Sequence, residues 1–382
     1  MLTYKDKKKL NNLIQKLIAL NQSLNLGTAT LTPLNYSEEK EKFLRSDTYN
    51  PQFKYSNQNI SLQQKEIIRC TEELHSLKLP KDLHNYVLEY VSSLSLTADA
   101  INTIGTSEFS RTVDKIFSFK NTDEKEFLKE ISSISFNDPG NCKLKNAEEM
   151  AEIFREYLKN LQIGYTVEVD YTNDHIIRVG QQKLIVGAKV KRFCNNIQRL
   201  LTHEIDSHVL QRCNLSTSDS SLLRLIPQGD SLLWGEGLAV YNEIHSGRIT
   251  KNAFETYYYR LKAVHMLDKS FREIFDYLSR YMKPTKAYMI TYRVKRGMGN
   301  TQLPGGYTKD ASYALGYQTV DTYIKKGGCI EMLYISRIPY IGEFLLENEL
   351  IETTAIKIPN YLTTPISTVS RQTGIYPIFS SV

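Results

Sequence analysis

Hydrophobic residues recur every three or four positions along most of this chain, which is the spacing of amphipathic helices. Near the N-terminus, for example, Leu10, Leu13, Ile14 and Leu17 fall on one helix face. The same pattern predicts helices at about residues 5–22, 60–77, 81–102, 107–118, 123–132, 147–161, 193–212, 233–247, 252–282 and 308–326.

Alternation of apolar and polar residues is confined to residues 165–186. It predicts strands at 165–169, 176–179 and 184–186, separated by turns. We therefore expect an α+β fold that is predominantly α, in which a small antiparallel sheet lies next to long helices. The turn-rich stretch 135–146 is the best candidate boundary between an N-terminal helical region, 1–140, and a second region, 141–382. We expect the two regions to pack as one compact unit.

The composition is that of a soluble globular protein, with 41% hydrophobic and 24% charged residues. No apolar run approaches the roughly 18 residues that a membrane helix needs. Asn11, Asn12 and Gln15 interrupt the first apolar run, so the sequence does not predict a signal peptide. We expect a protein that contacts no membrane and is cytoplasmic, or is exported by a route that the sequence does not show. The net charge of +6 is a small excess, and the sequence contains no pattern of a nucleic-acid-binding module.

The cysteines do not follow a pattern that would predict disulfides. Their number is odd, they lie far apart, and none belongs to a Cys-x-x-Cys pair. This argues against both a disulfide framework and a cysteine zinc site. We expect small buried hydrophobic side chains at Cys70, Cys142, Cys194, Cys213 and Cys329.

The segment His203-Glu204-Ile205-Asp206-Ser207-His208 falls within a predicted helix. In the His-Glu-x-x-His motif of zinc peptidases, two histidines four residues apart share a helix face, and the glutamate is the general base. Here the histidines are five residues apart, which on a regular α-helix separates their directions by roughly 140°. A one-residue expansion of the π type would reduce that angle to roughly 50°. The spacing therefore predicts a distorted helix between His203 and His208.

Glu236 is the predicted third metal ligand. It interrupts the apolar segment 232–241 between Gly235 and Gly237, two glycines that would allow a neighbouring helix to approach closely. A carboxylate in such surroundings is costly to bury unless it is paired or binds a metal ion. Glu243 is the rival, seven residues later on the same helix face, but its polar neighbours favour a solvated charge.

Two histidines and one glutamate leave the fourth position of a zinc ion open, as in catalytic rather than structural zinc sites. We therefore expect one Zn²⁺ per chain, bound by His203, His208 and Glu236. Glu204 is the predicted catalytic residue, which takes a proton from the activated water and passes it to the leaving amine. Asp206 could support the metal ligands or be solvated, and the sequence does not decide between these roles.

Several segments of the chain resemble the microtubule-associated tyrosine carboxypeptidase family. Bacterial relatives carry a Gln-Glu-Gly-Leu-Ala motif, which here reads Gly-Glu-Gly-Leu-Ala at residues 235–239. Residues 49–55 are similar to the family's Asn-Pro-x-Phe-x-Tyr block, and residues 104–109 to its Ile-Gly-Thr-Pro-Glu-Phe segment, with Ser107 in place of proline. Residues 293–297 and 304–313 resemble a further block that contains a Lys-Asp dipeptide.

The resemblance implies a metallo-carboxypeptidase that removes a C-terminal residue, which is the tyrosine of α-tubulin for the animal enzymes. Region 141–382 would then be the metallopeptidase catalytic region. The partner would be the C-terminal tail of a peptide or protein, and the positive net charge permits an acidic tail. Such an enzyme needs a cation for the terminal carboxylate of the substrate. The candidate substrate-binding residues are Arg293, Lys295, Arg296 and Lys309, with Tyr307 as a candidate hydrogen-bond donor to the oxyanion.

Two other classes of function fit the same residues. An endopeptidase or an aminopeptidase could use the same zinc site, and would differ in the charged group at the end of the substrate cleft. A non-catalytic protein that binds partners on a peptidase scaffold is the third interpretation. The presence of Glu204 argues against it, because a protein without catalysis would be free to lose that residue.

Overall fold

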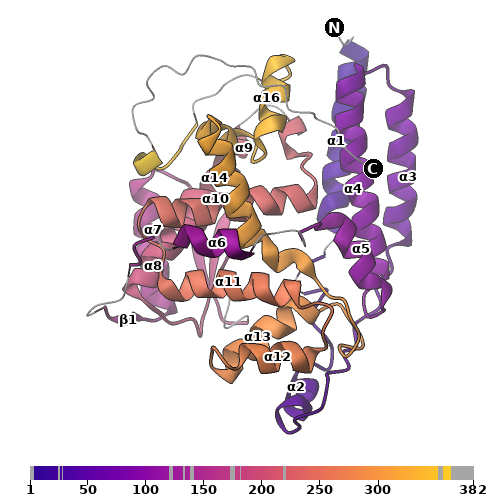
Figure 1. Cartoon of the computed structure of the whole chain (residues 1–382). Coiled ribbons are helices and arrows are strands. Elements are labelled where there is room, and N and C mark those ends of the chain that lie inside the picture. Colours follow the sequence, from indigo (N-terminus) through magenta and orange to yellow (C-terminus); the bar gives the residue numbers. More distant parts are fainter. Residues whose placement is uncertain are drawn as a thin grey trace. The chain divides into compact units, whose positions relative to one another are not determined.

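The computed structural model describes residues 4–24, 26–27, 29–119, 124–131, 134–137, 142–172, 177–180, 182–217, 221–351 and 356–362. Helices predominate and two small sheets accompany them, so the expected α+β fold with a predominance of α is confirmed (Figure 1). The chain divides into two compact units. Unit 1 comprises Met1–Lys129, Arg224–Leu232 and Glu255–Leu315, and unit 2 comprises Glu130–Leu223, Leu233–Phe254 and Gly316–Val382.

The predicted boundary at residue 140 lies shortly after the beginning of unit 2. Unit 1 also takes up two later segments, so both units contain parts of the predicted region 141–382. Residues 138–141 of the turn-rich stretch lie outside the described residues.

Unit 1 is built from helices. Three long helices, α1 (Tyr4–Ser23), α3 (Ser61–Ser76) and α4 (Lys81–Asn102), lie side by side (Figure 1). Each contributes fully buried apolar side chains, such as Leu13, Leu74 and Val87. The elements that contribute to this unit are α1 (Tyr4–Ser23), α2 (Tyr36–Leu44), α3 (Ser61–Ser76), α4 (Lys81–Asn102), α5 (Glu108–Ile116), α6 (Glu124–Ile131), α11 (Lys251–His265), α12 (Phe271–Leu278), α13 (Pro284–Lys295) and the 3₁₀-helix η3 (Thr308–Ala311).

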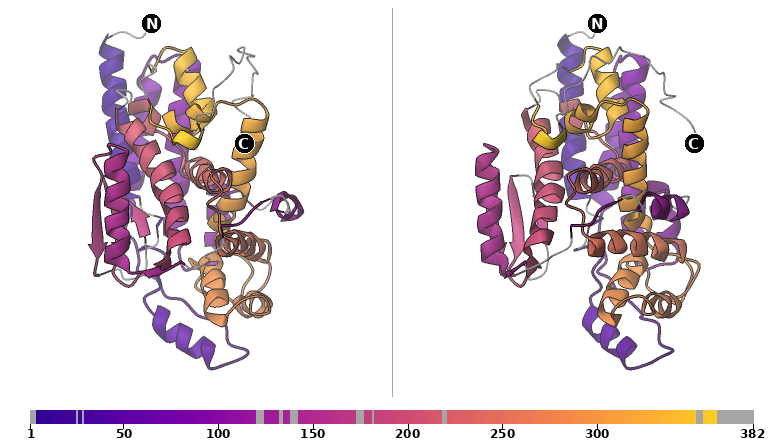
Figure 2. Two further views of the ribbon diagram at one scale, coloured as in Figure 1. Left: turned by 90° about the vertical axis from the view of Figure 1, so that its left-hand side faces the viewer. Right: turned by 60° about the vertical axis from the view of Figure 1, so that its left-hand side comes forward.

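Unit 2 combines the sheets with the remaining helices. Helix α7 (Ala147–Asn160) packs against the larger of the two sheets, which has three strands, as Figure 2 shows. The strands are β1 (Leu144–Lys145), β2 (Thr166–Asp170), β3 (Ile177–Val179), β4 (Lys183–Gly187) and β5 (Arg192–Phe193). The helices are α7 (Ala147–Asn160), α8 (Cys194–Leu200), η1 (Leu201–Val209), α9 (Leu210–Thr217), η2 (Ser221–Arg224), α10 (Gln228–His245), α14 (Ser312–Lys325), α15 (Ile330–Ile335), α16 (Pro339–Glu347) and η4 (Asn360–Leu362), of which η2, α10 and α14 extend into segments of unit 1.

The larger sheet is mixed, so the expectation of an antiparallel sheet is wrong for one of its two strand pairs. Strands β3 and β4 pair antiparallel, but β2 and β4 pair parallel, with Val167 opposite Leu184. The strand order is β2-β4-β3, which places β4 in the centre. The alternation of residues predicts strands but not their order, and the order decides which neighbours run parallel.

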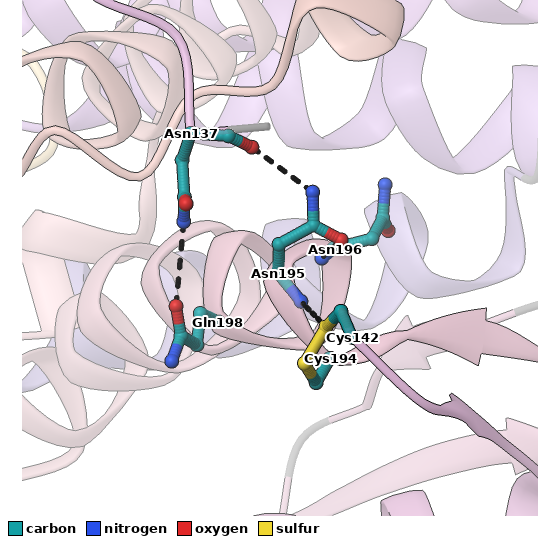
Figure 3. The surroundings of a disulfide bond; sticks show 6 residues. All are labelled: Asn137, Cys142, Cys194, Asn195, Asn196 and Gln198. Atoms are coloured by element: carbon teal, nitrogen blue, oxygen red, sulfur yellow. Dashed lines mark hydrogen bonds between the residues drawn. A yellow bond between two sulfur atoms is a disulfide. The ribbon is translucent and has the colours of Figure 1, made fainter. Parts of the chain in front are cut away.

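The small β1–β5 pair brings two cysteines together, which corrects the expectation that all five are unpaired. Leu144 lies opposite Phe193, and Cys142 and Cys194 beside them form a disulfide across a sequence separation of 52 residues (Figure 3). The backbone N–H of Asn195 donates to Sγ of Cys142 over 3.1 Å. Of the other cysteines, Cys70 is buried, Cys213 is half-buried and Cys329 is exposed. The pairing of β1 with β5, and not the spacing of cysteines in the sequence, brings Cys142 and Cys194 together.

The predicted helix 252–282 is two helices, α11 and α12. Ser270 begins α12 with a capping box, in which its Oγ accepts from the N–H of Glu273 and the Glu273 carboxylate accepts from the N–H of Ser270. This Ser-x-x-Glu signal competes with continuation of α11 and ends it. Helices α2, α13, α15 and α16 were not predicted. None of the described helices is long and apolar enough to span a bilayer, and the cytoplasmic location stays a prediction.

Candidate metal centre

The helix that carries His203 and His208 is widened, as the spacing of the two histidines predicts. Residues Leu201–Val209 form the π-helix η1, which continues α8 and leads into α9. The backbone N–H of Leu210 donates to the carbonyl oxygen of Ile205, five residues earlier. Since a π-type turn contains more residues than an α-turn, side chains five positions apart return to the same face. The predicted distortion is confirmed.

Glu236 on α10 faces the two histidines. Its Oε2 lies 3.3 Å from Nε2 of His203 and 3.8 Å from Nε2 of His208. One nitrogen or oxygen atom from each of the three side chains lies within 4.8 Å of the others. The fold therefore brings the three predicted metal-binding residues together from two helices, and their binding of zinc stays a prediction. Glu204 follows His203 on η1 and is partly exposed.

The electrostatics of this cluster suit a bound cation. Oε2 of Glu236 is buried and accepts no hydrogen bond from the described part of the chain. Burial by itself would raise the pKa of Glu236, but the two neighbouring imidazoles hold it well below its ordinary value. Burial would likewise lower the pKa of His203, but Glu236 and Glu243 raise it to about 10. The donor set therefore favours positive charge at its centre, which a divalent cation would supply.

Glu243 is not the solvated charge that its neighbours in the sequence suggested. Its side chain is fully buried, and its Oε1 lies 2.7 Å from Nδ1 of His203 and 2.5 Å from Nη1 of Arg199. Glu243 therefore holds the imidazole so that Nε2 faces Glu236. Helical spacing could have revealed this contact. Glu243 lies about two turns after Glu236 on α10, and Arg199 lies about one turn before His203.

Asp206 is buried, which excludes the solvated role that the sequence left open. Its Oδ1 accepts a hydrogen bond from the hydroxyl of Tyr157 over 2.8 Å, and its Oδ2 lies 3.5 Å from Nη1 of Arg248. Burial raises the pKa of Asp206 to about 6 although both partners lower it. Through Tyr157, the aspartate ties the π-helix to α7.

A second set of hydrogen bonds stabilises the widened helix from α10 and α15. Nδ2 of Asn242 donates to Oγ of Ser207 and to the hydroxyl oxygen of Tyr334, in both cases over 2.8 Å. The Tyr334 hydroxyl donates to the carbonyl oxygen of Asp206, and Oγ of Ser207 donates to that of Thr202. Two carbonyl groups of η1 thus gain side-chain donors, which compensates for the irregular backbone. Nothing in the sequence pattern identified Asn242 or Tyr334.

The two glycines beside Glu236 have different roles. A Cβ atom on Gly237 would lie 2.3 Å from the carbonyl oxygen of Gly316, so α10 and α14 touch through their backbones at this point. A Cβ atom on Gly235 would have no neighbour closer than 3.8 Å. The expectation that glycine allows a close helix approach is therefore confirmed for Gly237 and wrong for Gly235.

The predicted substrate-binding residues lie in unit 1, whereas the metal cluster lies in unit 2. Nη2 of Arg293 donates to Oδ1 of Asp310 over 2.7 Å. Lys295 is fully buried, and its Nζ donates to the carbonyl oxygens of Leu303 and Gly305 over 2.8 and 2.9 Å. Burial lowers the pKa of Lys295 to about 8. These contacts stabilise the loop that follows α13.

The other three candidates also lie near this loop. The guanidinium of Arg296 lies 4.9 Å from the ring centre of Tyr307, and both side chains are buried. The Tyr307 hydroxyl donates to the carbonyl oxygen of Leu26 over 3.4 Å. Lys309 belongs to η3. Binding of substrate by any of the five residues stays a prediction.

These features define an α-rich protein with a candidate metal centre of two histidines and one glutamate on a widened helix. A family model described as microtubule-associated tyrosine carboxypeptidase matches residues 41–380, and the chain belongs to this family. The chain is also 23% identical over 337 residues to the Mus musculus protein named "Putative tyrosine carboxypeptidase MATCAP2". The match covers 87% of this chain and 58% of the mouse protein, so the chain spans little more than half of that relative.

Proposed function

We propose that this chain is a zinc-dependent carboxypeptidase that hydrolyses the C-terminal peptide bond of protein or peptide substrates. One observation carries the proposal: potential ligand atoms of His203, His208 and Glu236 lie within 4.8 Å of one another, although Glu236 comes from a different helix than the two histidines. Membership of the tyrosine carboxypeptidase family supports the choice of an exopeptidase. By extension from the family and from the name of the mouse relative, the C-terminal residue removed would be tyrosine or another bulky residue.

The residues of the candidate metal centre would have separate roles in the reaction. His203, His208 and Glu236 would hold zinc, which when bound supplies a Lewis acid that activates water and polarises the scissile carbonyl. The Glu204 carboxylate would accept the proton of the attacking water and deliver it to the nitrogen of the leaving amino acid. Glu243 would keep His203 in the orientation that binds metal, because it accepts the proton on Nδ1.

The test begins with purified protein loaded with zinc. Elemental analysis should find about one zinc per chain, and a peptide library should show release of single C-terminal residues. The Glu204→Gln variant removes the general base without touching a metal ligand, so it should retain zinc and lose at least about 100-fold in rate. Unchanged activity in this variant, or a protein that binds no zinc, would contradict the mechanism. Cleavage within the peptides, or release from their N-termini, would favour an endopeptidase or an aminopeptidase instead.

A further inference from the structure

A half-buried arginine with an unusual backbone conformation lies in unit 2, between α15 and α16. Arg337 has a φ angle of 63°, in the left-handed region that residues other than glycine rarely adopt. The neighbouring residue fixes this turn, because Oγ of Ser336 is buried and donates to the carbonyl oxygen of Ile338 over 2.6 Å. Strained residues that the surrounding structure holds in place are often found at functional sites.

Arg337 and a metal-centre histidine border the same small space. The position that a Cβ atom of Gly235 would occupy is 3.8 Å from Cδ of Arg337 and 4.0 Å from Cε1 of His208. Gly235 immediately precedes Glu236 on α10, and Oε1 of Gln211 lies 3.9 Å from the same position. The side chain of Arg337 therefore passes beside the candidate metal-binding cluster, on the side of His208, and its guanidinium interacts electrostatically with Glu236.

The charges around Arg337 favour an anion. Burial and the neighbouring Arg212 both lower the pKa of Arg337, to about 10, and Glu236 counteracts them. Binding of a metal ion to Glu236 would weaken the electrostatic attraction between its carboxylate and the Arg337 guanidinium. A carboxylate from a ligand would then meet the Arg337 guanidinium and a cation in a partly desolvated place.

We propose that Arg337 binds the α-carboxylate of the substrate's last residue and so restricts the centre to free C-termini. This inference rests on the proposed function. When a C-terminal peptide bond lies at the metal centre, only one residue separates the scissile carbonyl from the terminal carboxylate, a distance of about 3.5 Å. The cation that binds this carboxylate must therefore be a close neighbour of the metal ligands, as Arg337 is. A guanidinium can also hold both carboxylate oxygens at once.

Two peptides of identical sequence test this assignment, one with a free C-terminal carboxylate and one with a C-terminal amide. Release of the last residue by the zinc-loaded full chain is measured for both peptides. Wild-type protein should prefer the free acid by about 100-fold or more in kcat/KM, the size expected for a partly buried charge pair. Arg337→Met should lose that preference, mainly through a higher KM for the acid, with unchanged release from the amide and unchanged zinc content.

Two further variants make the result decisive. Since a φ of 63° suits glycine, Arg337→Gly removes the charge without adding backbone strain, and it should behave like the methionine variant. Arg178→Met removes an exposed arginine of unit 2 that is ion-paired with Asp170, and it should retain the full preference. If Arg337→Met does not fold, the glycine variant decides.

The outcomes separate the two proposals. Wild-type protein that contains zinc and releases nothing from either peptide contradicts the proposed function and this inference with it. Wild-type protein that prefers the acid while both Arg337 variants keep that preference contradicts this inference alone. In that case Arg296→Met, which removes a cation of unit 1, is tested with the same two peptides. Loss of the preference in this variant would show that a residue predicted from the sequence binds the terminal carboxylate of the substrate.

Discussion

At the scale of single residues, the candidate metal centre depends on contacts that reach beyond its three candidate ligands. His203 uses Nε2 toward Glu236 and Nδ1 toward Glu243, so both ring nitrogens face carboxylates. Arg199 shares Oε1 of Glu243 and balances its buried charge. Because the imidazole cannot rotate without breaking one of these contacts, it is preorganised for a metal ion.

Glu243→Ala should weaken zinc binding by about 10- to 100-fold, the usual effect of losing a residue that orients a metal ligand. Glu243→Gln keeps a hydrogen-bond acceptor and should therefore lose less zinc affinity than Glu243→Ala. Competition with a chromophoric chelator measures the affinity, and the exposed Glu152→Ala serves as the control. Equal zinc affinity in wild type and Glu243→Ala would show that Glu243 has no part in the centre.

At the scale of elements, two departures from regular helix packing position the centre. The π-helix η1 brings the histidines onto one face, and the contact between Gly237 and Gly316 brings α10 against α14. Glu236 lies one residue before that contact, so the approach of the helices also determines where the third candidate ligand lies. Side chains larger than hydrogen would force the two backbones apart.

Gly237→Ala should lower the free energy of unfolding by at least about 1–3 kcal/mol, because the added methyl group meets backbone that cannot rotate away. Gly235→Ala is the matched control, since the nearest atoms to its added Cβ lie 3.8 Å away. It should be neutral or stabilising by up to about 1 kcal/mol, because alanine favours helix more than glycine does. Urea unfolding of both variants measures the difference, and equal stabilities would contradict the close contact.

At the scale of the whole molecule, neither compact unit is a continuous stretch of chain. Unit 1 gains much of its polar core from its last segment, where Asp310 is 1% exposed and lies among arginines. Arg293 donates to this carboxylate, and Nε of Arg260 lies 3.7 Å from Oδ2. Burial would raise the pKa of Asp310, but the two arginines hold it well below its ordinary value.

This depressed pKa predicts how stability depends on pH. Asp310 stays ionised in the folded protein at pH values where the unfolded chain takes up a proton, so its contribution is complete above about pH 4 and is lost as the pH falls below it. Asp310→Asn should cost about 3–5 kcal/mol at pH 7, because it leaves two half-buried arginines without their carboxylate partner. The difference from wild type should shrink at pH 3.

Guanidinium unfolding at the two pH values measures this effect. Asp276→Asn is the control, because Asp276 is exposed and its carboxylate lies 3.6 Å from Nη1 of Arg272. It should change stability little at either pH. A constant difference between wild type and Asp310→Asn at pH 7 and pH 3 would contradict the assigned pKa shift.

Local patterns were sufficient for much of the fold. Apolar spacing located most of the helices, and alternation located the strands of the larger sheet, because both depend on which side of an element is buried. Breaks and connections were harder to predict. The capping box at Ser270 divides a predicted helix, and the strand order makes one β-pair parallel. The first result depends on competition between a capping signal and the continuation of the helix. The second depends on which distant strand pairs with which.

The sequence by itself determined the three candidate ligands, the candidate general base and the widened helix. It could do so because a fixed number of residues per turn makes helix geometry a local property. Only the tertiary structure decided that Glu243 is buried against His203, that Cys142 pairs with Cys194, and that Arg337 borders the candidate metal-binding cluster. Each of these relations joins segments far apart in the chain, and no local spacing encodes which distant side chain will fill the space beside another.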